Sequence, residues 1–481
     1  MSFEAARPIL EAMSASLPAE LRAGHLDRDR WAQWLKTADA GVRHRLDAGE
    51  ENTLSNLLRF GVTFTKEYRI DDEYFARYGE SSLVDSFAEH RAQDLIRALA
   101  TPGNNQGFIE MRALLERKEF PLKIPADRAA AKRYLLNNLA RMHGEFLQAR
   151  EQAKTNRSQM FQNRGISLDS NLWPDYDFDV QLARMAAKGM LKPGSVRKVA
   201  IVGPGLDFVN KQEGVDFYPP QTLQPFLVLD SLLRLGLAGT GANGGALEIH
   251  TLDISSLVNA HITAARKSAA AGRPYTVQLP WPAGGRWSGE FRGKFVDYWR
   301  ALGSRIGEPV APIPVPQAVA GIETRAVRIR ADIVGNVKPL DMNIVYQVLP
   351  LPPGERFDLI VGTNIFLYYR DPHDRSARHH GLHLLLPASF RNVAPKKGLG
   401  WCGLSPEAGT CSASPPWALS PARLGLNPSE VSPKVSRQER HVGFRIIRVF
   451  DFATLQATGL KPGFTAESRA NTRSARSPGR G

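Results

Sequence analysis

The stretch that decides the fold of this chain is Val199-Ala200-Ile201-Val202-Gly203-Pro204-Gly205, four apolar residues followed by a glycine turn. A strand that is apolar at every position is typical of a parallel sheet, because helices cover both faces of such a sheet. The two glycines allow a sharp turn and allow a ligand to come close to the backbone. The stretch therefore predicts the first strand of a parallel α/β sheet, with a ligand site where the strand ends.

Helical and strand-like segments alternate on the C-terminal side of this stretch. Two further apolar runs, 247–252 and 357–361, are followed by Asp253 and by Gly362-Thr363-Asn364. Helical periodicity marks the segments 220–237, 257–271 and 291–306, and the segments 327–334 and 342–348 are β-prone. Strands that alternate with helices predict a mostly parallel, Rossmann-like sheet with helical crossovers.

Three regions of the chain differ in pattern. Residues 1–160 carry apolar residues at helical spacing, so we expect an α-helical N-terminal domain there. Residues 165–390 hold the α/β pattern and begin with a short amphipathic helix over 180–190. After Arg370, Pro, Gly and Ser make up 34 of the remaining 111 residues, so we expect the tail over 391–481 to be disordered.

The composition limits the classes of protein to which this chain can belong. No run of 18 uninterrupted apolar residues is present and the first residues do not resemble a secretory signal, so we expect no membrane partner. Both cysteines, Cys402 and Cys411, lie in the last quarter, which favours a cytoplasmic protein without disulfides. Of the net charge of +14, residues 371–481 contribute +9, from 16 Lys and Arg against 7 Asp and Glu. Contact with nucleic acid is therefore expected only through this basic tail.

The residues that follow the three apolar runs are the candidate binding residues. Gly203 and Gly205 follow the first run, Asp253 follows the second, and Asn364 follows the third. Because parallel strands place their carboxyl ends at one edge, these residues are expected to lie together there. A carboxylate can accept hydrogen bonds from ribose hydroxyls, and an amide can face a reacting centre.

Around these residues the chain resembles the class I S-adenosylmethionine-dependent methyltransferases over about 170 residues, 199 to 369. The stretch 199–205 resembles their first motif, and Leu247 to Ser255 resembles their second strand. The stretch Phe357-Asp358-Leu359-Ile360-Val361-Gly362-Thr363-Asn364-Ile365-Phe366-Leu367-Tyr368-Tyr369 is similar to their fourth motif, in the form seen in chemotaxis-receptor methyltransferases.

The resemblance implies S-adenosyl-L-methionine as the cofactor and an unknown methyl acceptor as the substrate. Gly203 and Gly205 would support the methionine part of the cofactor, and Asp253 would bind its ribose. Asn364 would line the reacting face, and Tyr368 or Tyr369 could contact the substrate. The segment 165–190 would take the place of the helix that precedes the sheet in the family.

The chain departs from the family pattern at its first motif. The strand lacks an acidic residue, and Leu206-Asp207-Phe208 follows the turn in place of a third small residue. Asp207 is therefore the candidate to replace the missing acid in binding the cofactor. Between Gly205 and Asp253 lie about 48 positions, against about 20 in the dinucleotide fingerprint. The excess includes an insertion, 207–220, which is either a substrate element or a surface loop.

The end of the pattern departs further, because the family has three more strands after the fourth motif. A sheet that stopped after four strands would leave an unpaired edge, unless tail segments such as 382–386 and 444–450 supplied strands. A tail that replaces the family's own ending, as a reading-frame shift would produce, is one interpretation. A non-catalytic or truncated methyltransferase-like protein, acting as an interaction module, is therefore the alternative function. A nicotinamide-dependent oxidoreductase fits less well, because a third glycine is absent.

No motif predicts a metal site. Four histidines, His373, His379, His380 and His383, lie close together, but their spacing matches no standard zinc pattern. The two cysteines do not form a Cys-x-x-Cys pair either. We therefore expect no bound metal.

Overall fold

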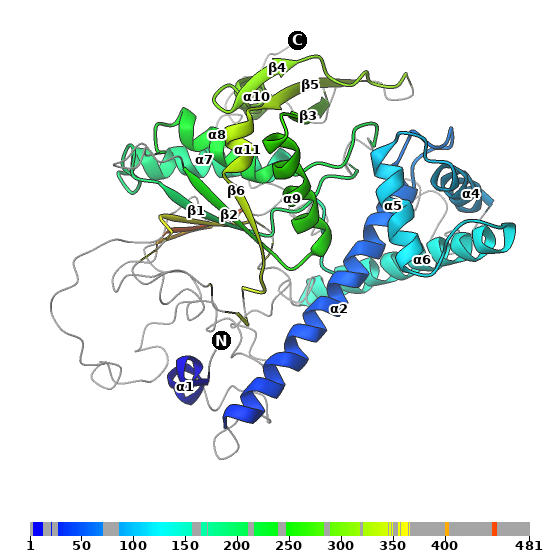
Figure 1. The fold of residues 1–481 in the computed structure, drawn as a ribbon, viewed down its shortest axis with the longest axis horizontal. Coiled ribbons are helices and arrows are strands. Elements are labelled where there is room, and N and C mark those ends of the chain that lie inside the picture. Colours follow the sequence, from blue (N-terminus) through cyan, green and yellow to red (C-terminus); the bar gives the residue numbers. More distant parts are fainter. Residues whose placement is uncertain are drawn as a thin grey trace, which may run out of the picture.

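The computed structural model combines an N-terminal helical region with a parallel α/β sheet and a small antiparallel sheet (Figure 1). It describes residues 3–12, 21, 27–70, 86–155, 165–170, 172–209, 216–238, 247–282, 289–317, 321–344, 346, 347, 349, 355, 357–363, 365, 400–403 and 445–449. The mixed α/β class and the helical N-terminal region predicted from the sequence are confirmed.

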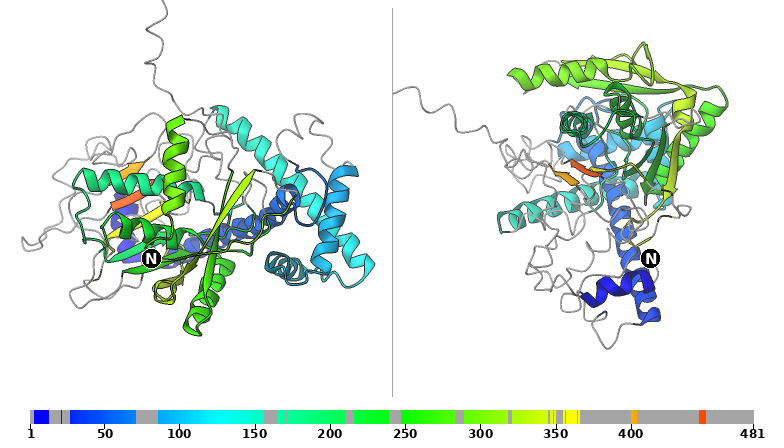
Figure 2. Two further views of the ribbon diagram at one scale, coloured as in Figure 1. Left: turned by 90° about the horizontal axis from the view of Figure 1, so that it is seen from above. Right: turned by 90° about the vertical axis from the view of Figure 1, so that its left-hand side faces the viewer.

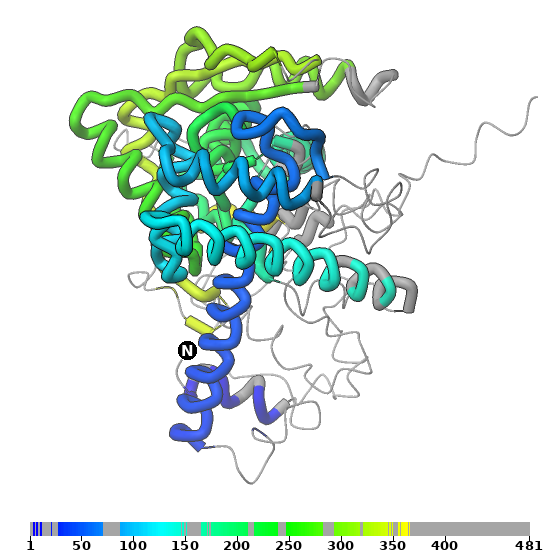
Figure 3. Tube along the Cα trace, turned by 90° about the vertical axis from the view of Figure 1, so that its right-hand side faces the viewer, coloured from blue at the N-terminus to red at the C-terminus, as the bar shows by residue number. Residues whose placement is uncertain are grey.

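The helical region consists of five helices in the described residues. They are α1 (Phe3–Ala12), α2 (Arg28–Phe60), α4 (Ser86–Ala100), α5 (Gln106–Arg117) and α6 (Pro125–Thr155). Helix α2 begins where the Asp27 side chain accepts a hydrogen bond from the Arg30 N–H, and α5 begins with Asn105 in the same role. Figure 3 shows α6 crossing the long helix α2, and the two helices are in contact.

The α/β region follows the predicted alternation. It contains α7 (Leu172–Ala187), β1 (Lys198–Val202), α8 (Gln224–Arg234), β2 (Glu248–Asp253), α9 (Ser256–Ala270), α11 (Ala331–Gly335), β6 (Val337–Asp341) and β7 (Leu359–Thr363). The parallel sheet has the order β6-β2-β1-β7, continued beyond β7 by β9 (Arg445–Val449) and β8 (Gly400–Gly403). The strand expected over 444–450 thus pairs with β7, whereas 382–386 lies outside the described residues.

Both faces of the parallel sheet are covered, which explains why β1 is apolar at every central position. Val199 and Ile201 belong to a core shared with α7, α8 and α9. Ala200 and Val202 belong to a second core on the other face, where Val42 and Leu46 of α2 pack. Helix α2 therefore belongs to two structures, because its N-terminal half covers the sheet and its C-terminal half joins the helical region.

An antiparallel sheet that the sequence analysis did not predict follows α9. Its strands are β3 (Tyr275–Pro282), β5 (Ile322–Ile329) and β4 (Gly307–Val310), in that order, with α10 (Gly289–Ala301) between β3 and β4. In the right-hand view of Figure 2 these strands and α10 form a separate layer at the top.

Two predicted strands are wrong, one in part and one completely. The β-prone segment 327–334 is a strand only as far as Ile329, where β5 ends, and its second half belongs to the helix α11. The β-prone segment 342–348 is not a strand in its described residues, and the strand lies just before it, at β6. Met342 and Ile344 are instead buried in the second core, so their apolar character reflects packing against α2. Strand β7 begins two residues later than predicted, because Asp358 accepts hydrogen bonds from the N–H groups of Arg197 and Lys198.

Candidate functional site

The strand order locates the candidate site. Along the chain the sheet grows from β1 to β2 and then to β6 on one side, whereas β7 lies on the other side of β1. In open parallel sheets, ligands bind beyond the carboxyl ends of the strands where this direction reverses. That point lies between the ends of β1 and β7, next to the glycine turn.

The glycine turn needs both of its glycines. Gly203 and Gly205 have φ values of 63° and 69°, which side chains other than glycine rarely adopt. A Cβ atom on Gly205 would lie 2.7 Å from the backbone oxygen of Leu168, so the segment 165–170 packs directly against the turn. A Cβ atom on Gly203 would lie 3.1 Å from the Ile365 side chain. The close approach at Gly205 is therefore made by the protein's own backbone.

Asp253 lies at the carboxyl end of β2, as predicted, and it is tied to the turn. Its residue surface is 7% exposed. Its carboxylate accepts hydrogen bonds from the backbone N–H groups of Ser255, at 2.8 Å, of Gly205 and of Ile254. Burial raises the pKa of Asp253 to about 7, against the effect of these donors. Because a carboxylate offers about four acceptor positions, about one remains for a ligand.

The structure adds a second carboxylate, which the sequence analysis missed. Asp341 ends β6 and lies level with Asp253 across the strand pair. Its side chain is 60% exposed, and Arg43 of α2 contacts it at 3.3 Å. The sequence offered a usable signal, an acidic residue after Val337-Lys338-Pro339-Leu340, but Lys and Pro hid the strand.

Helix α2 reaches this edge at two places. The Nε atom of Arg43 also donates to Asp39 at 3.0 Å. Its Nη1 atom lies 3.5 Å from the Ile254 carbonyl oxygen. Further along the helix, Asn56 donates a hydrogen bond of 3.0 Å to Asp169 in the segment that covers Gly205. The N-terminal region therefore supplies side chains to the edge of the sheet.

Asp207 lies within the insertion's own network. Its carboxylate accepts hydrogen bonds from the Tyr218 hydroxyl at 3.1 Å and from the Gln221 amide at 3.0 Å. The side chain is buried, and burial raises the pKa of Asp207 to about 7. Both donors are neutral, so no cation is among the hydrogen-bond partners of Asp207 in the described residues. Among the described residues, the Asp207 side chain is hydrogen-bonded to Tyr218 and Gln221 and not to Asp253. The structure therefore does not bring the two predicted carboxylates together.

The insertion is anchored to the helical region. Asp216 accepts hydrogen bonds from the N–H groups of Val62 and Thr63, at 3.0 and 3.2 Å, and from the Thr63 hydroxyl at 2.8 Å. Arg91, which is fully buried, donates to the carbonyl groups of the loop that follows α2, including that of Gly61. The described part of the insertion is thus a structural connection between the two regions.

The predicted catalytic residue, Asn364, lies outside the described residues, as do Tyr368 and Tyr369. The last described strand residue before it is Thr363, whose hydroxyl accepts a hydrogen bond of 2.7 Å from Gln224 at the start of α8. The four clustered histidines are also outside the described residues. Within the part of the chain that the structure describes, no group of three or more His, Cys, Asp and Glu could hold a metal ion.

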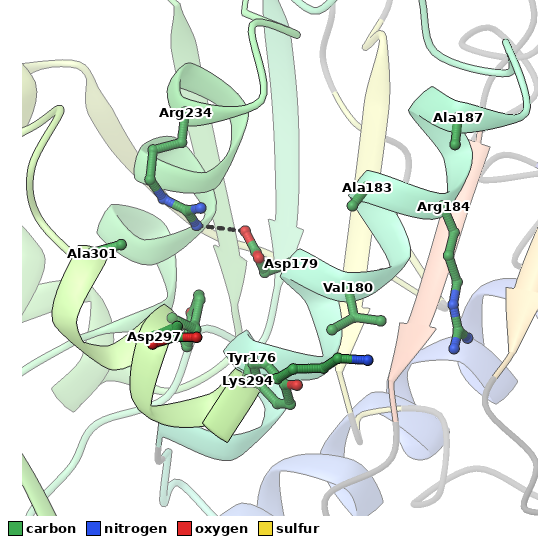
Figure 4. A pocket seen from close by; sticks show the side chains of 11 residues that line it. Tyr176, Asp179, Val180, Ala183, Arg184, Ala187, Arg234, Lys294, Asp297 and Ala301 are labelled. Carbon is green, nitrogen blue, oxygen red and sulfur yellow. Dashed lines mark hydrogen bonds and ion pairs between the residues drawn. The ribbon is translucent and has the colours of Figure 1, made fainter. Parts of the chain in front are cut away.

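A groove of about 500 Å³ lies elsewhere, between α7 and α10 (Figure 4). Val180 and Ala183 line it from α7, and Asp297 and Ala301 line it from α10. Arg234 of α8 forms an ion pair of 2.5 Å with Asp179 of α7, which the figure marks with a dashed line. The positive and negative side chains along it are mixed, so its charge does not favour one class of ligand.

None of the helices in the described ranges is long and apolar enough to cross a membrane. No protein-family model and no curated protein matches this chain.

Proposed function

We propose that this protein is a methyltransferase that uses S-adenosyl-L-methionine, bound at the carboxyl edge of the parallel sheet. One observation carries the proposal: the glycine turn after β1, with two positive φ values, lies next to Asp253 at the end of β2, and Asp341 is level with Asp253 on β6, one strand further from the turn. Glycine turns and strand-end carboxylates are the parts with which such sheets bind adenosine-containing ligands.

Different residues of the site would bind different parts of such a ligand. Asp253 keeps about one acceptor position beyond its three backbone donors, which suits one ribose hydroxyl. Asp341 is open to solvent and can accept from a second hydroxyl or from the amino group of the base. The turn at Gly203 and Gly205 would support the methionine part. Asp207, held by Tyr218 and Gln221, would act on this site only by supporting the insertion.

Catalysis would consist mainly of positioning. The sulfonium of the cofactor supplies an activated methyl group, and the protein aligns an acceptor for in-line attack. The residues after Thr363, Asn364 above all, would line the reacting face in this proposal.

Calorimetric titration with S-adenosylmethionine tests the proposal. We expect Asp253→Ala to weaken binding about 10- to 150-fold, because one hydrogen bond from a ligand to a charged carboxylate is worth about 1.5–3 kcal/mol. Asp341→Ala should weaken it about 5- to 10-fold without a change in folding, since its side chain is exposed. The control is Asp332→Ala, an exposed acid on α11. Absence of binding at millimolar cofactor would refute the proposal.

The affinity should also depend on pH. An ionised carboxylate accepts hydrogen bonds better than a neutral one and attracts the positive sulfonium. Because the pKa of Asp253 is about 7, we expect the affinity to rise between pH 6 and pH 8. In Asp253→Ala this rise should be absent.

A second function, a non-catalytic protein that acts as an interaction module, is favoured by another observation. The Leu168 carbonyl already occupies the space beside Gly205, and Asp253 uses most of its acceptor positions on the backbone. In that case the turn serves to close the edge of the sheet. A folded protein that shows no response to S-adenosylmethionine in the same titration would support this function.

A further inference from the structure

Arg43 bridges the ends of the two strands that carry the candidate ribose-binding carboxylates. It extends from helix α2, and its Nη1 atom lies 3.5 Å from the carbonyl oxygen of Ile254, directly after β2. Its Nη2 atom lies 3.3 Å from a carboxylate oxygen of Asp341, at the end of β6. In dinucleotide-binding sheets, an arginine near the end of the second strand binds a phosphate group on the 2′ position of the ribose. Arg43 is therefore placed where such an arginine would be.

Asp39 makes Arg43 unsuitable for binding a phosphate. It lies one turn before Arg43 on α2, and its carboxylate accepts a hydrogen bond of 3.0 Å from the Arg43 Nε atom. Its other oxygen accepts a hydrogen bond of 2.8 Å from the side-chain amide of Asn343, so Asp39 is held from two sides. The positive guanidinium thus faces two carboxylates, those of Asp39 and Asp341, and the three groups together are negative. They would repel a phosphate, whereas an uncharged ribose hydroxyl would not be repelled.

The second phosphate-binding element of such sheets is closed as well. In dinucleotide-binding folds, free N–H groups at the start of the helix after the first strand bind the pyrophosphate. Here that helix is α8, and Pro225 in its first turn has no N–H. The N–H groups of Phe226 and Leu227 bond to the Leu223 carbonyl, and both residues are 1% exposed. Within the described residues, the start of α8 therefore presents no open anion site.

We propose that Asp39 determines which adenosine ligands the site accepts. Together with Asp341 it neutralises Arg43, so the site favours ligands whose ribose carries only hydroxyl groups and rejects those with a phosphate on the ribose. The inference rests on the proposed function for the position of the ligand, but not for the methyl transfer. It gives a specificity role at the sheet to a residue of α2, the helix that packs on the sheet through Val42 and Leu46.

Adenosine and adenosine 2′-phosphate differ by one phosphate group and are the probes. Their dissociation constants are measured by titration calorimetry at one low salt concentration, because salt screens the charges. We expect the wild type to bind adenosine at least about tenfold more tightly than its 2′-phosphate. In Asp39→Asn the amide oxygen can still accept from Asn343, but the N–H₂ group cannot accept from Arg43, so the guanidinium is released. This variant should bind the phosphate about tenfold more tightly than the wild type does, and adenosine within about twofold.

Asp29→Asn is the matched control. Asp29 is an exposed acid in the first turn of the same helix, and its replacement changes the net charge by the same amount. It should leave both dissociation constants unchanged. Arg43→Gln tests the mechanism, because Asp39→Asn should give no gain in phosphate affinity in that background.

The Asp39 and Arg43 side chains are 29% and 38% exposed, so we expect the variants to fold, and thermal unfolding checks this. If Asp39→Asn does not fold, Asp39→Ser takes its place, since it also removes the charge. Equal binding of the two probes by the wild type would overturn the proposal. A gain in Asp29→Asn as large as that in Asp39→Asn, a gain that persists without Arg43, or failure of both probes to bind would overturn it as well.

S-adenosylmethionine, titrated in parallel, separates this inference from the proposed function. If the two probes bind as expected and S-adenosylmethionine does not bind, the methyltransferase proposal fails and the role of Asp39 stands. If S-adenosylmethionine binds and the wild type does not discriminate between the probes, the role of Asp39 fails and the proposed function stands.

Discussion

Asp207→Asn is the substitution whose effect the structure defines most closely. The Gln221 amide is fixed, because its oxygen accepts from the Gln278 N–H at 2.7 Å and its nitrogen donates to the Gln278 carbonyl at 2.8 Å. That nitrogen also donates to Asp207. In the variant, the amide oxygen would take this bond, and its N–H₂ group would face the Tyr218 hydroxyl, which can accept. The replacement therefore preserves the network and removes the charge.

The magnitude follows from the pKa. Asp207 has a pKa of about 7 in the folded protein, and 3.8 is the ordinary value expected in the unfolded chain. The folded state thus holds the proton more tightly, so the contribution to stability is complete below pH 3.8 and is lost as the pH rises through 7. Between pH 5 and pH 8 the loss amounts to about 2.5 kcal/mol. Asn cannot ionise, so Asp207→Asn should not show this loss of stability as the pH rises.

Urea unfolding of both proteins at four pH values between 5 and 8 measures the difference. Subtracting the two curves removes the effects of other groups, such as Asp253, which titrate in both proteins. The matched control is Asp230→Asn. Asp230 is also buried, but it pairs with Arg234 at 3.2 Å and accepts from the Arg305 N–H, so Asn must lose one of two bonds. We expect Asp230→Asn to destabilise the protein. Parallel curves for wild type and Asp207→Asn would refute the reasoning.

Two further substitutions test how the site is built. Gly205→Ala should lower the free energy of unfolding by about 2–4 kcal/mol, because it adds a clash with the Leu168 carbonyl to an unfavourable φ. Gly236→Ala, at a similar φ with open space around it, should lower it by only about 1 kcal/mol, and equal effects on chemical unfolding would contradict the packing argument. Asp216→Ala should lower the free energy of unfolding by about 2–4 kcal/mol, since it leaves the N–H groups of Val62 and Thr63 without their acceptor. Asp216→Asn keeps that acceptor oxygen and should melt within a few degrees of the wild type; a large effect in thermal unfolding would show that the charge matters instead.

The sequence alone determined the core of the parallel sheet. A short apolar run followed by a glycine turn is typical of a strand that is buried on both faces of a sheet. β1 is such a strand. The apolar run over 247–252 predicted β2 to within one residue at each end, since the strand is Glu248–Asp253. The strand within 444–450 was also predicted, and it pairs with β7. The domain limits, the cofactor and the reaction stay predictions.

Short-range patterns failed where a strand lies at the edge of the sheet. β6 contains Lys338 and Pro339, residues that an interior strand rarely tolerates. An edge strand is hydrogen-bonded to a neighbouring strand on one side only, so the missing N–H of a proline can face away from the sheet. β6 therefore forms without the run of apolar residues that marks β1 and β7. Asp341, which ends β6, was missed for this reason.

Only the tertiary structure decided which residues surround the candidate site. Arg43 and Asp341 are 298 positions apart, and Asn56 and Asp169 are 113 positions apart, yet each pair is hydrogen-bonded. Periodicity shows that α2 is a helix, but it does not show that its first half packs on the sheet, since an apolar stripe fits many partners. The charge states of Asp175, Asp207 and Asp253 likewise depend on burial, which is set by the packing of several segments together. Local sequence fixes the strands and turns because their hydrogen bonds and burial repeat over a few residues, whereas a site depends on distances that only the folded chain defines.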